Sequence, residues 1–238
     1  MKKLALLVLL TAAAHGQISP RPPDAVVPVV GSTRGQSNAN FKTELQLANP
    51  TDAIMEGWLY LRPHDLVLRY SLEPHTTRAF ADVVAEMGGS GLGSLDVLIE
   101  RGERPVVVAR AFDDQPTGTT GANVPAVPAA AVLARTDAAA LIAPRDLTRF
   151  RFNIGVRALD SGATINLTVR SSSGAQRTFR TLTYPAHQFE QQPANTFAGI
   201  TLEPNDAIEI EVAAGSAIVY GSMVDNVTND SSLQVLRK

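Results

Sequence analysis

The chain has 238 residues, of which 45% are hydrophobic and 18% charged. This balance is typical of a globular protein and too apolar for an intrinsically disordered chain. The formal charge is −2, and the arginines are spread along the chain, so the sequence shows no basic cluster of the kind that binds nucleic acid. The chain contains no cysteine, which excludes disulfides, thiolate metal sites and a thiol nucleophile.

Residues 1–16 have the pattern of a secretory signal peptide. Lys2 and Lys3 precede an apolar run, and Ala12 and Ala14 form the small pair that signal peptidase accepts. The run of about 11 residues is well short of the roughly 20 that span a bilayer. We therefore expect export, cleavage after Ala14 or Gly16, and a mature protein that is not inserted in a membrane. A buried N-terminal helix is the alternative.

The first half of the chain alternates short strand patterns with turn residues. In Phe41–Ala48, apolar and polar residues alternate, which is typical of a strand with one buried face. Gly31–Asn40 is predicted as a polar loop and Ala79–Met87 as one or two turns of helix. The predicted strands are Val26–Val30, Phe41–Ala48, Trp58–Arg62, Leu66–Leu72, Leu95–Glu100 and Pro105–Phe112.

The second half shows the same style of pattern after an Ala/Pro stretch, Pro125–Ala134. Its C-terminal Leu233–Leu236 could add an edge strand or simply cover the core. Short strands at this spacing favour an antiparallel β-sandwich, and nothing indicates βαβ units. The predicted strands are Leu141–Ala143, Phe150–Leu159, Thr164–Arg170, Arg177–Tyr184, Ala207–Ala213 and Ala217–Val224.

Several of these segments recur at one fixed offset. Phe41–Leu47 aligns with Phe152–Ala158, 111 residues further on, and Val97–Glu100 aligns with Ile208–Glu211 at the same offset. A constant spacing of this kind indicates two copies of one structural unit. The predicted fold is therefore all-β, with two tandem antiparallel Ig-like β-sandwiches, residues 24–128 and 136–238, after a cleaved signal peptide (residues 1–16).

The first copy resembles a known group of proteins. The order of its motifs is similar to that of tandem β-sandwich repeats exported by acidobacteria and related soil and aquatic bacteria. The motifs are carried by Val27–Val30, Phe41–Pro50, Pro74–Val84 and Val106–Arg110. The second copy matches less well, since Asp160-Ser161 stands where the first has Asn49-Pro50. The resemblance implies an exported location and a β-sandwich fold, and it implies no chemistry.

The glycines and histidines give no sign of a cofactor or metal site. Gly88–Gly93 follows a predicted helix and precedes a strand, the reverse of a nucleotide-binding loop, so a flexible turn is predicted. No two histidines have the close spacing of metal ligands. His15 lies near the cleavage site, and the other three are predicted in solvent-exposed turns: His64, His75 and His187.

The remaining candidates are acids and serines. Asp113-Asp114 and Asp225–Asp230 are predicted in equivalent loops after the same strand, where several oxygens could bind calcium. Asp and Asn are also common in turns for backbone reasons alone, and Asp114 and Asp225 are predicted to be exposed. No serine lies in a Gly-x-Ser-x-Gly nucleophile elbow. The sequence thus assigns no catalytic, cofactor-binding or metal-binding residue, and no cofactor.

These observations predict a non-enzymatic function. We expect a non-catalytic interaction, adhesion or assembly module of the cell envelope or extracellular space, with an unknown protein or glycan partner and no nucleic acid. Binding would use loops or an exposed strand edge. One alternative is a carbohydrate- or calcium-dependent binding module, although the chain has only one Trp, four Tyr and eight Phe to supply a glycan platform. A second alternative is an unrecognised hydrolase.

Overall fold

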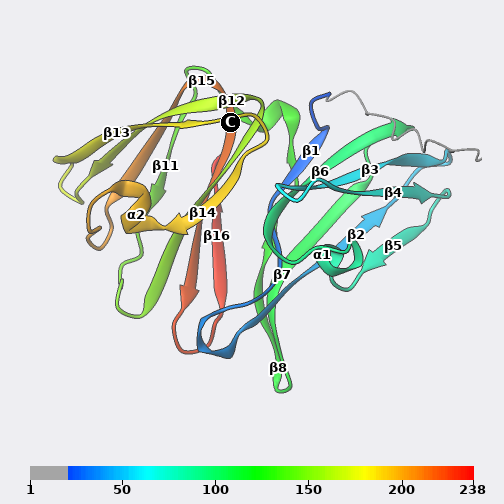
Figure 1. Ribbon diagram of the computed structural model, residues 1–238, viewed down its shortest axis with the longest axis horizontal. Helices are drawn as coiled ribbons and strands as arrows, with labels where there is room; N and C mark the ends of the chain where they lie inside the picture. Colours follow the sequence, from blue (N-terminus) through cyan, green and yellow to red (C-terminus); the bar gives the residue numbers. More distant parts are fainter. Residues whose placement is uncertain (1–20) are drawn as a thin grey trace, which may run out of the picture.

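The protein folds mainly into antiparallel strands. The computed structural model describes residues 21–238, so the predicted signal peptide, residues 1–16, and His15 lie outside the described residues. Strands form two hydrogen-bonded sheet systems, one in each half of the chain, and the helices are short (Figure 1). The predicted all-β class is therefore confirmed.

The first sheet system holds nine strands and runs in the order β4-β3-β6-β1-β2-β7-β8, with β5 on β2 and β9 on β1. Leu45, Leu61 and Leu95 lie at the centre of its apolar core and are fully buried. A short helix, α1 (Val83–Glu86), begins at the N-cap Asp82, whose side chain accepts the N–H of Ala85. The strands are β1 (Ala25–Arg34), β2 (Asn40–Ala48), β3 (Met55–Arg62), β4 (Leu66–Leu72), β5 (Thr77–Phe80), β6 (Gly91–Arg101), β7 (Val106–Gln115), β8 (Gly118–Val124) and β9 (Val127–Pro128).

Strand β1 connects the two faces of the first half. From Ala25 to Ser32 it pairs with β6, and its last two residues, Thr33 and Arg34, pair with β2 instead. At the crossover the buried hydroxyl of Thr43 accepts the N–H of Gly31 at 2.8 Å and donates to its carbonyl at 3.2 Å. The hydroxyl thus replaces the ladder hydrogen bonds that the crossover interrupts, which explains a fully buried Thr in an apolar core.

The second sheet system holds seven strands and is organised around two long ones, β12 and β15, in the order β10-β15-β12-β13. Strands β11 and β16 add to β15, and β14 adds to β12. Ile154, Ile165 and Ile210 lie in its core. The elements are β10 (Leu133–Ala134), β11 (Ala138–Ile142), β12 (Phe150–Arg170), β13 (Gln176–Tyr184), β14 (Phe189–Pro193), α2 (Ala194–Ala198), β15 (Ala207–Asp225) and β16 (Ser231–Val235), with 3-10 turns at Gln36–Asn38 and Ala129–Ala131.

Two predicted chain breaks are wrong. Phe150–Leu159 and Thr164–Arg170 form the single strand β12, and Ala207–Ala213 and Ala217–Val224 form the single strand β15. Both strands bend where their pairing register shifts, between Ala158 and Ala163. Gly162 and Gly215 meet there with φ of 69° and 70°, and a Cβ on Gly215 would lie 2.0 Å from the carbonyl oxygen of Gly162. The glycines therefore permit a bulge in a continuous strand instead of ending it.

The two halves share one pairing scheme. In the first half β2 pairs with β5 and β7, and β3 pairs with β4 and β6. In the second half the first part of β12 pairs with β14 and the last part of β15. The last part of β12 pairs with β13 and the first part of β15. One long strand of the second half thus takes the place of two strands of the first.

Three smaller predictions need correction. Gly31–Asn40 is a loop only around its 3-10 turn, because β1 continues to Arg34. In the Gly88–Gly93 segment, Gly91–Gly93 begin strand β6, so the predicted flexible turn is wrong for them. In Ala79–Met87 only Val83–Glu86 is helical. Leu233–Leu236 does both things that the sequence allowed: β16 pairs with β15, and Leu236 is buried in the core.

Candidate functional site

A buried ion pair joins the two halves. Arg157 on β12 is fully buried and donates from one Nη to both carboxylate oxygens of Asp96 on β6, at 2.8 and 2.6 Å. Asp96 is 2% exposed, and the Nε of Arg62 lies 3.4 Å from it. Burial raises the pKa of Asp96 against the opposing attraction of Arg157 and Arg62, and burial lowers the pKa of Arg157. Each charge is therefore costly to bury without its partner.

Unpaired polar atoms gather around this ion pair. Asp160 has both carboxylate oxygens buried without a hydrogen bond, and the Nδ1 of His187 lies 3.4 Å from one of them in poor geometry. Among residues 21–238, the other buried polar side-chain atoms without a hydrogen bond are the Nε of Arg157, the hydroxyls of Tyr60 and Ser94, and, elsewhere, an oxygen of Asp206. We call the region between the halves the joint, and define it as Tyr60, Arg62, Ser94, Asp96, Arg157, Asp160 and His187.

The joint brings together a histidine, a serine and acids, yet no catalytic arrangement forms. A Ser–His–Asp triad needs the nucleophile hydrogen-bonded to the histidine and the histidine to the acid. Within the described part of the chain the Ser94 hydroxyl has no partner, and His187 and Asp160 are not hydrogen-bonded. The geometry thus gives no support to the hydrolase alternative.

The histidines lie in turns as predicted, but their exposure differs. His64 is exposed and contacts the carbonyl of Leu92 at 3.2 Å, and His75 is exposed and contacts Asp52 at 2.9 Å. The prediction of an exposed side chain is wrong for His187, which is 26% exposed because its turn packs against the joint. Burial lowers the pKa of His187, and Arg62 and Arg157 lower it further, whereas Asp160 and Asp96 oppose them.

The histidine of the joint should make stability depend on pH. The unfolded chain takes up a proton below about pH 6.5, whereas folded His187, with its lowered pKa, resists protonation. Stability is therefore expected to fall as pH drops through about 6.5, and His187→Asn should remove part of that fall. Urea unfolding of both proteins at about pH 7.5 and about pH 5.5 tests this. Exposed His64→Asn is the control, and equal pH responses of all three proteins would contradict it.

Tyr220 anchors the second half in the first. Its side chain is fully buried and belongs to the core cluster of the first half, although the residue lies on β15. The hydroxyl donates to the side-chain oxygen of Gln191 at 2.8 Å, and the ring lies over Gly155. A third, small apolar cluster also joins the halves: Val26, Val127, Val132, Leu159 and Ile218. The joint, Tyr220 and this cluster together form one continuous interface.

The first pair of calcium candidates lies in a strand, so the predicted loop is wrong. Asp113 and Asp114 are part of β7, and Asp113 is 1% exposed. The carboxylate of Asp113 accepts the backbone N–H of Asn40 at 2.6 Å and the amides of Gln115 and Asn229 at 2.8 and 3.2 Å. Asp114 forms an ion pair with Lys42 at 2.7 Å. Three of these four carboxylate oxygens are occupied by donors of the protein itself.

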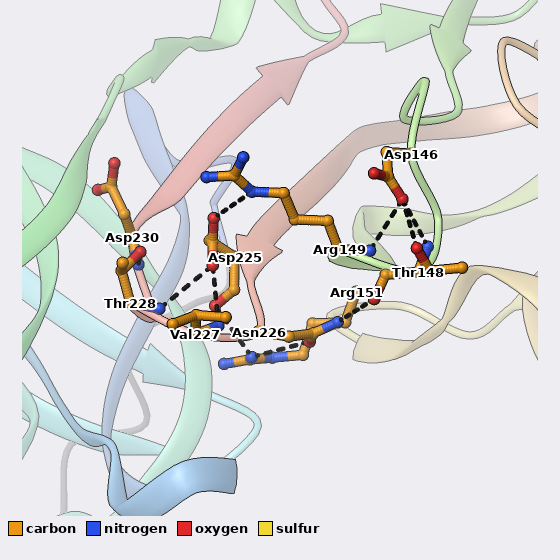
Figure 2. A network of polar contacts seen from close by, with 9 residues as sticks. All are labelled: Asp146, Thr148, Arg149, Arg151, Asp225, Asn226, Val227, Thr228 and Asp230. Atoms are coloured by element: carbon orange, nitrogen blue, oxygen red, sulfur yellow. Dashed lines mark hydrogen bonds and ion pairs between the residues drawn. The ribbon is translucent and has the colours of Figure 1, made fainter.

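The second candidate, Asp225–Asp230, does form a loop, and its first carboxylate organises it. Figure 2 shows one oxygen of Asp225 accepting the N–H groups of Val227 and Thr228, at 2.8 and 3.2 Å, and the other accepting Arg149 at 2.9 Å. The pKa of Asp225 is lowered by the Val227 N–H and by Arg149. Asp225 is 5% exposed, so the prediction that it is exposed is wrong. Arg151 then fixes the loop by donating to Asn226 and Asn229.

Calcium is not expected to stabilise the protein. Calcium takes six to eight oxygens, and here it would have to displace Arg149 from Asp225. Among residues 21–238 no group of three His, Cys, Asp or Glu side chains could hold a metal ion. We expect the melting temperature to be unchanged by calcium or EDTA, to fall in Asp225→Ala, and to change little in exposed Asp230→Ala. A rise with calcium that Asp225→Ala abolishes would contradict this expectation, because a ligand of the native state stabilises it.

A cleft of about 340 Å³ opens between the halves. One wall is the β1–β2 hairpin of the first half, and the other is the face of β12, β15 and β16; Figure 1 shows the hairpin beside the turn that joins β15 to β16. Asn229 and Thr228 of that turn hydrogen-bond to Asp113 and Thr120, which fixes the walls at this end. None of the described residues that line the cleft is acidic, and three are basic: Arg34, Lys42 and Arg151.

The residues of the joint and the cleft were not predicted from the sequence as sites. Comparisons of this chain with protein-family models, with curated proteins and with solved structures found no match. Across residues 21–238, no helix is long and apolar enough to cross a membrane. Functional inference for this chain therefore depends on its own geometry.

Proposed function

We propose that the protein is an exported, non-catalytic interaction module of the cell envelope or extracellular space, built from two tandem Ig-like β-sandwiches. The shared pairing scheme and the 111-residue offset between Phe41 and Phe152 support the tandem arrangement. The charged start, apolar run and Ala12-x-Ala14 support export. The partner is a protein or glycan that the mature chain meets outside the cytoplasm.

One observation carries the proposed binding role: the polar groups of the inter-half region divide into two sets. Asp113 and Asp225, the acids considered as calcium ligands, form hydrogen bonds within the protein that stabilise its structure. The cleft, by contrast, offers polar side chains that make no hydrogen bond to residues 21–238, such as Asn153 and Ser222. Concave sites between two units with a few free polar groups are typical of ligand binding.

The experiment is a binding screen with a parallel search for turnover. The mature chain should bind a component of the cell envelope, tested against cell-wall glycans and peptidoglycan with and without calcium. It should not turn over peptide, ester or glycan substrates. Reproducible turnover that His187→Ala or Ser94→Ala abolishes, with the fold intact by circular dichroism, would overturn the proposal. Recovery of the native protein from the cytosol with Met1 still present would contradict the proposed export.

A specific observation favours the carbohydrate-binding alternative as the second candidate. On the second half, Phe179 is 55% exposed and lies opposite Thr168, and Glu209 lies on the other side of Thr168 in the same cross-strand row. Asn166 and Glu211 lie in the adjacent cross-strand row, and all five line one shallow depression. Glu209 is paired with Arg170, but an exposed ring with the carboxylate of Glu211 and the amide of Asn166 in the same depression can stack on a sugar and bind its hydroxyls. Loss of glycan binding in Phe179→Ala, but not in exposed Val108→Ala, would support this alternative.

A further inference from the structure

We propose that the cleft between the halves binds a small amphipathic organic acid, with its carboxylate at the Arg34–Arg151 end and its hydrocarbon part at the Leu92–Leu233 end. This inference rests on the proposed binding role and specifies the chemistry of the ligand. It is argued from three features of the cleft: its charge, its free hydrogen-bonding groups and its polarity from one end to the other.

The charge of the cleft favours an anion. Arg34 forms no ion pair or side-chain hydrogen bond within residues 21–238. Arg151 donates to the side-chain oxygens of Asn226 and Asn229, and no carboxylate lies within 4.0 Å of it in the described chain. Burial lowers the pKa of Arg151, whereas Asp113 and Asp225 oppose this shift from beyond 4.0 Å, so its charge is partly desolvated without a directly paired counter-ion. Lys42 is already paired with Asp114 and contributes less. A ligand carboxylate would supply the missing partner.

Neutral donors lie beside these cations. The side chains of Gln36, Asn153, Ser222 and Ser231 line the cleft, and none of them makes a side-chain hydrogen bond to the described residues. Gln191 is different, because its side-chain oxygen already accepts the hydroxyl of Tyr220. Amide and hydroxyl donors of this kind can bind the oxygens of a carboxylate that a guanidinium holds in place.

The register of the strands places the basic residues Arg34 and Arg151 at one end of the cleft and Leu92 and Leu233 further along it. On the second half, Arg151, Val224 and Ser231 form one cross-strand row. The row two residues along contains Asn153, Ser222 and Leu233. Along this wall the charge is thus confined to the first row, and the second row is neutral.

The wall of the first half shows the same arrangement, with the positive charge that is unpaired within the described chain at one end. Arg34 lies at the hairpin end of β1, whereas Val29, Val30 and Leu92 lie further up the wall, with Leu92 opposite Gly31. Arg34 and Arg151 lie at the same end of the cleft because a series of contacts connects the two walls there. Phe41, which pairs with the neighbour of Arg34 on β1, also pairs with Asp113 on β7. The Asp113 carboxylate accepts the amide of Asn229, whose side-chain oxygen accepts Arg151. A ligand with a charged head and an apolar body matches this gradient.

Isothermal titration with three matched probes tests the inference on the mature chain. Octanoate carries the charge and the chain, octanamide has the chain without the charge, and acetate has the charge without the chain. Octanoate should bind saturably and about tenfold or more tightly than either control, and added salt should weaken it. Arg34→Gln should weaken octanoate about tenfold and leave octanamide unchanged. Exposed Arg104→Gln, outside the cleft, should leave both unchanged.

The outcomes separate this inference from the proposed function. Equal affinity for octanoate and octanamide, or no binding of octanoate at all, would overturn the inference. In either case, continued binding of an envelope component would leave the proposed function in place. Substrate turnover would overturn the proposed function whatever the affinity for octanoate. If Arg34→Gln has no effect on octanoate while Leu92→Gln weakens it, the acid binds by its chain alone and the assigned orientation is wrong.

Discussion

Arg157→Met is expected to lower the free energy of unfolding by about 3–5 kcal/mol, the usual cost of removing one partner from a buried ion pair. The variant leaves Asp96 buried, with only Arg62 at 3.4 Å to offset its charge. Methionine fills much of the space that the arginine stem occupied, so the loss reports mainly on charge. Urea unfolding, followed by far-ultraviolet circular dichroism and by the fluorescence of Trp58, measures it.

Two further variants make the result interpretable. Arg170→Met breaks an ion pair with Glu209 that is 2.9 Å long but has side chains 38% and 44% exposed, and should cost less than about 1 kcal/mol. Asp96→Leu combined with Arg157→Met removes both charges and should recover most of the loss. If Arg157→Met costs no more than Arg170→Met, the buried pair does not hold the halves together.

The sequence predicts the strands of this protein better than it predicts the joint. Alternation in segments such as Phe41–Ala48 locates a strand and its two faces, because side chains of a strand point alternately to opposite sides. It does not say whether the second face meets solvent or another part of the protein. Arg157 and Asp96 lie on that second face, and each looks like an ordinary solvent-facing residue until the halves are docked. An acid within the apolar run Leu95–Ile99 was the one signal of a buried pair.

The cleft could not be predicted from the sequence for a related reason. Its walls come from residues more than 100 positions apart, such as Arg34 and Arg151, and only the docked halves bring them together. The sequence pattern divides each of the long strands β12 and β15 into two predicted strands, because Gly162 and Gly215 are ordinary turn signals. Their role as a pair of facing glycines depends on their contact with each other, which a linear pattern does not contain. Asp225 likewise looked like an exposed loop acid, whereas it is the residue that the loop folds around.

Gly155→Ala is expected to disrupt the interface as severely as Tyr220→Ala, each costing about 3–5 kcal/mol of unfolding free energy. A Cβ on Gly155 would lie 2.1 Å from the ring of Tyr220, far inside contact distance. The ring cannot move aside without leaving the core of the first half, where it is fully buried, and without losing Gln191 at 2.8 Å. The methyl group therefore acts by expelling the tyrosine. Urea unfolding of both variants measures the cost. Exposed Phe179→Ala is the control, and its free energy of unfolding should change by less than about 0.5 kcal/mol.

A double-mutant cycle tests whether the two residues act as one contact. In Tyr220→Ala the space above Gly155 is empty, so adding Gly155→Ala should change stability by less than about 1 kcal/mol. The combined loss should then be close to that of either single variant instead of their sum. Additive losses would show that Gly155 is needed for a reason other than its contact with Tyr220, for example for the path of β12 itself. A small loss in Tyr220→Ala alone would show that the halves are held together by the joint and not by this anchor.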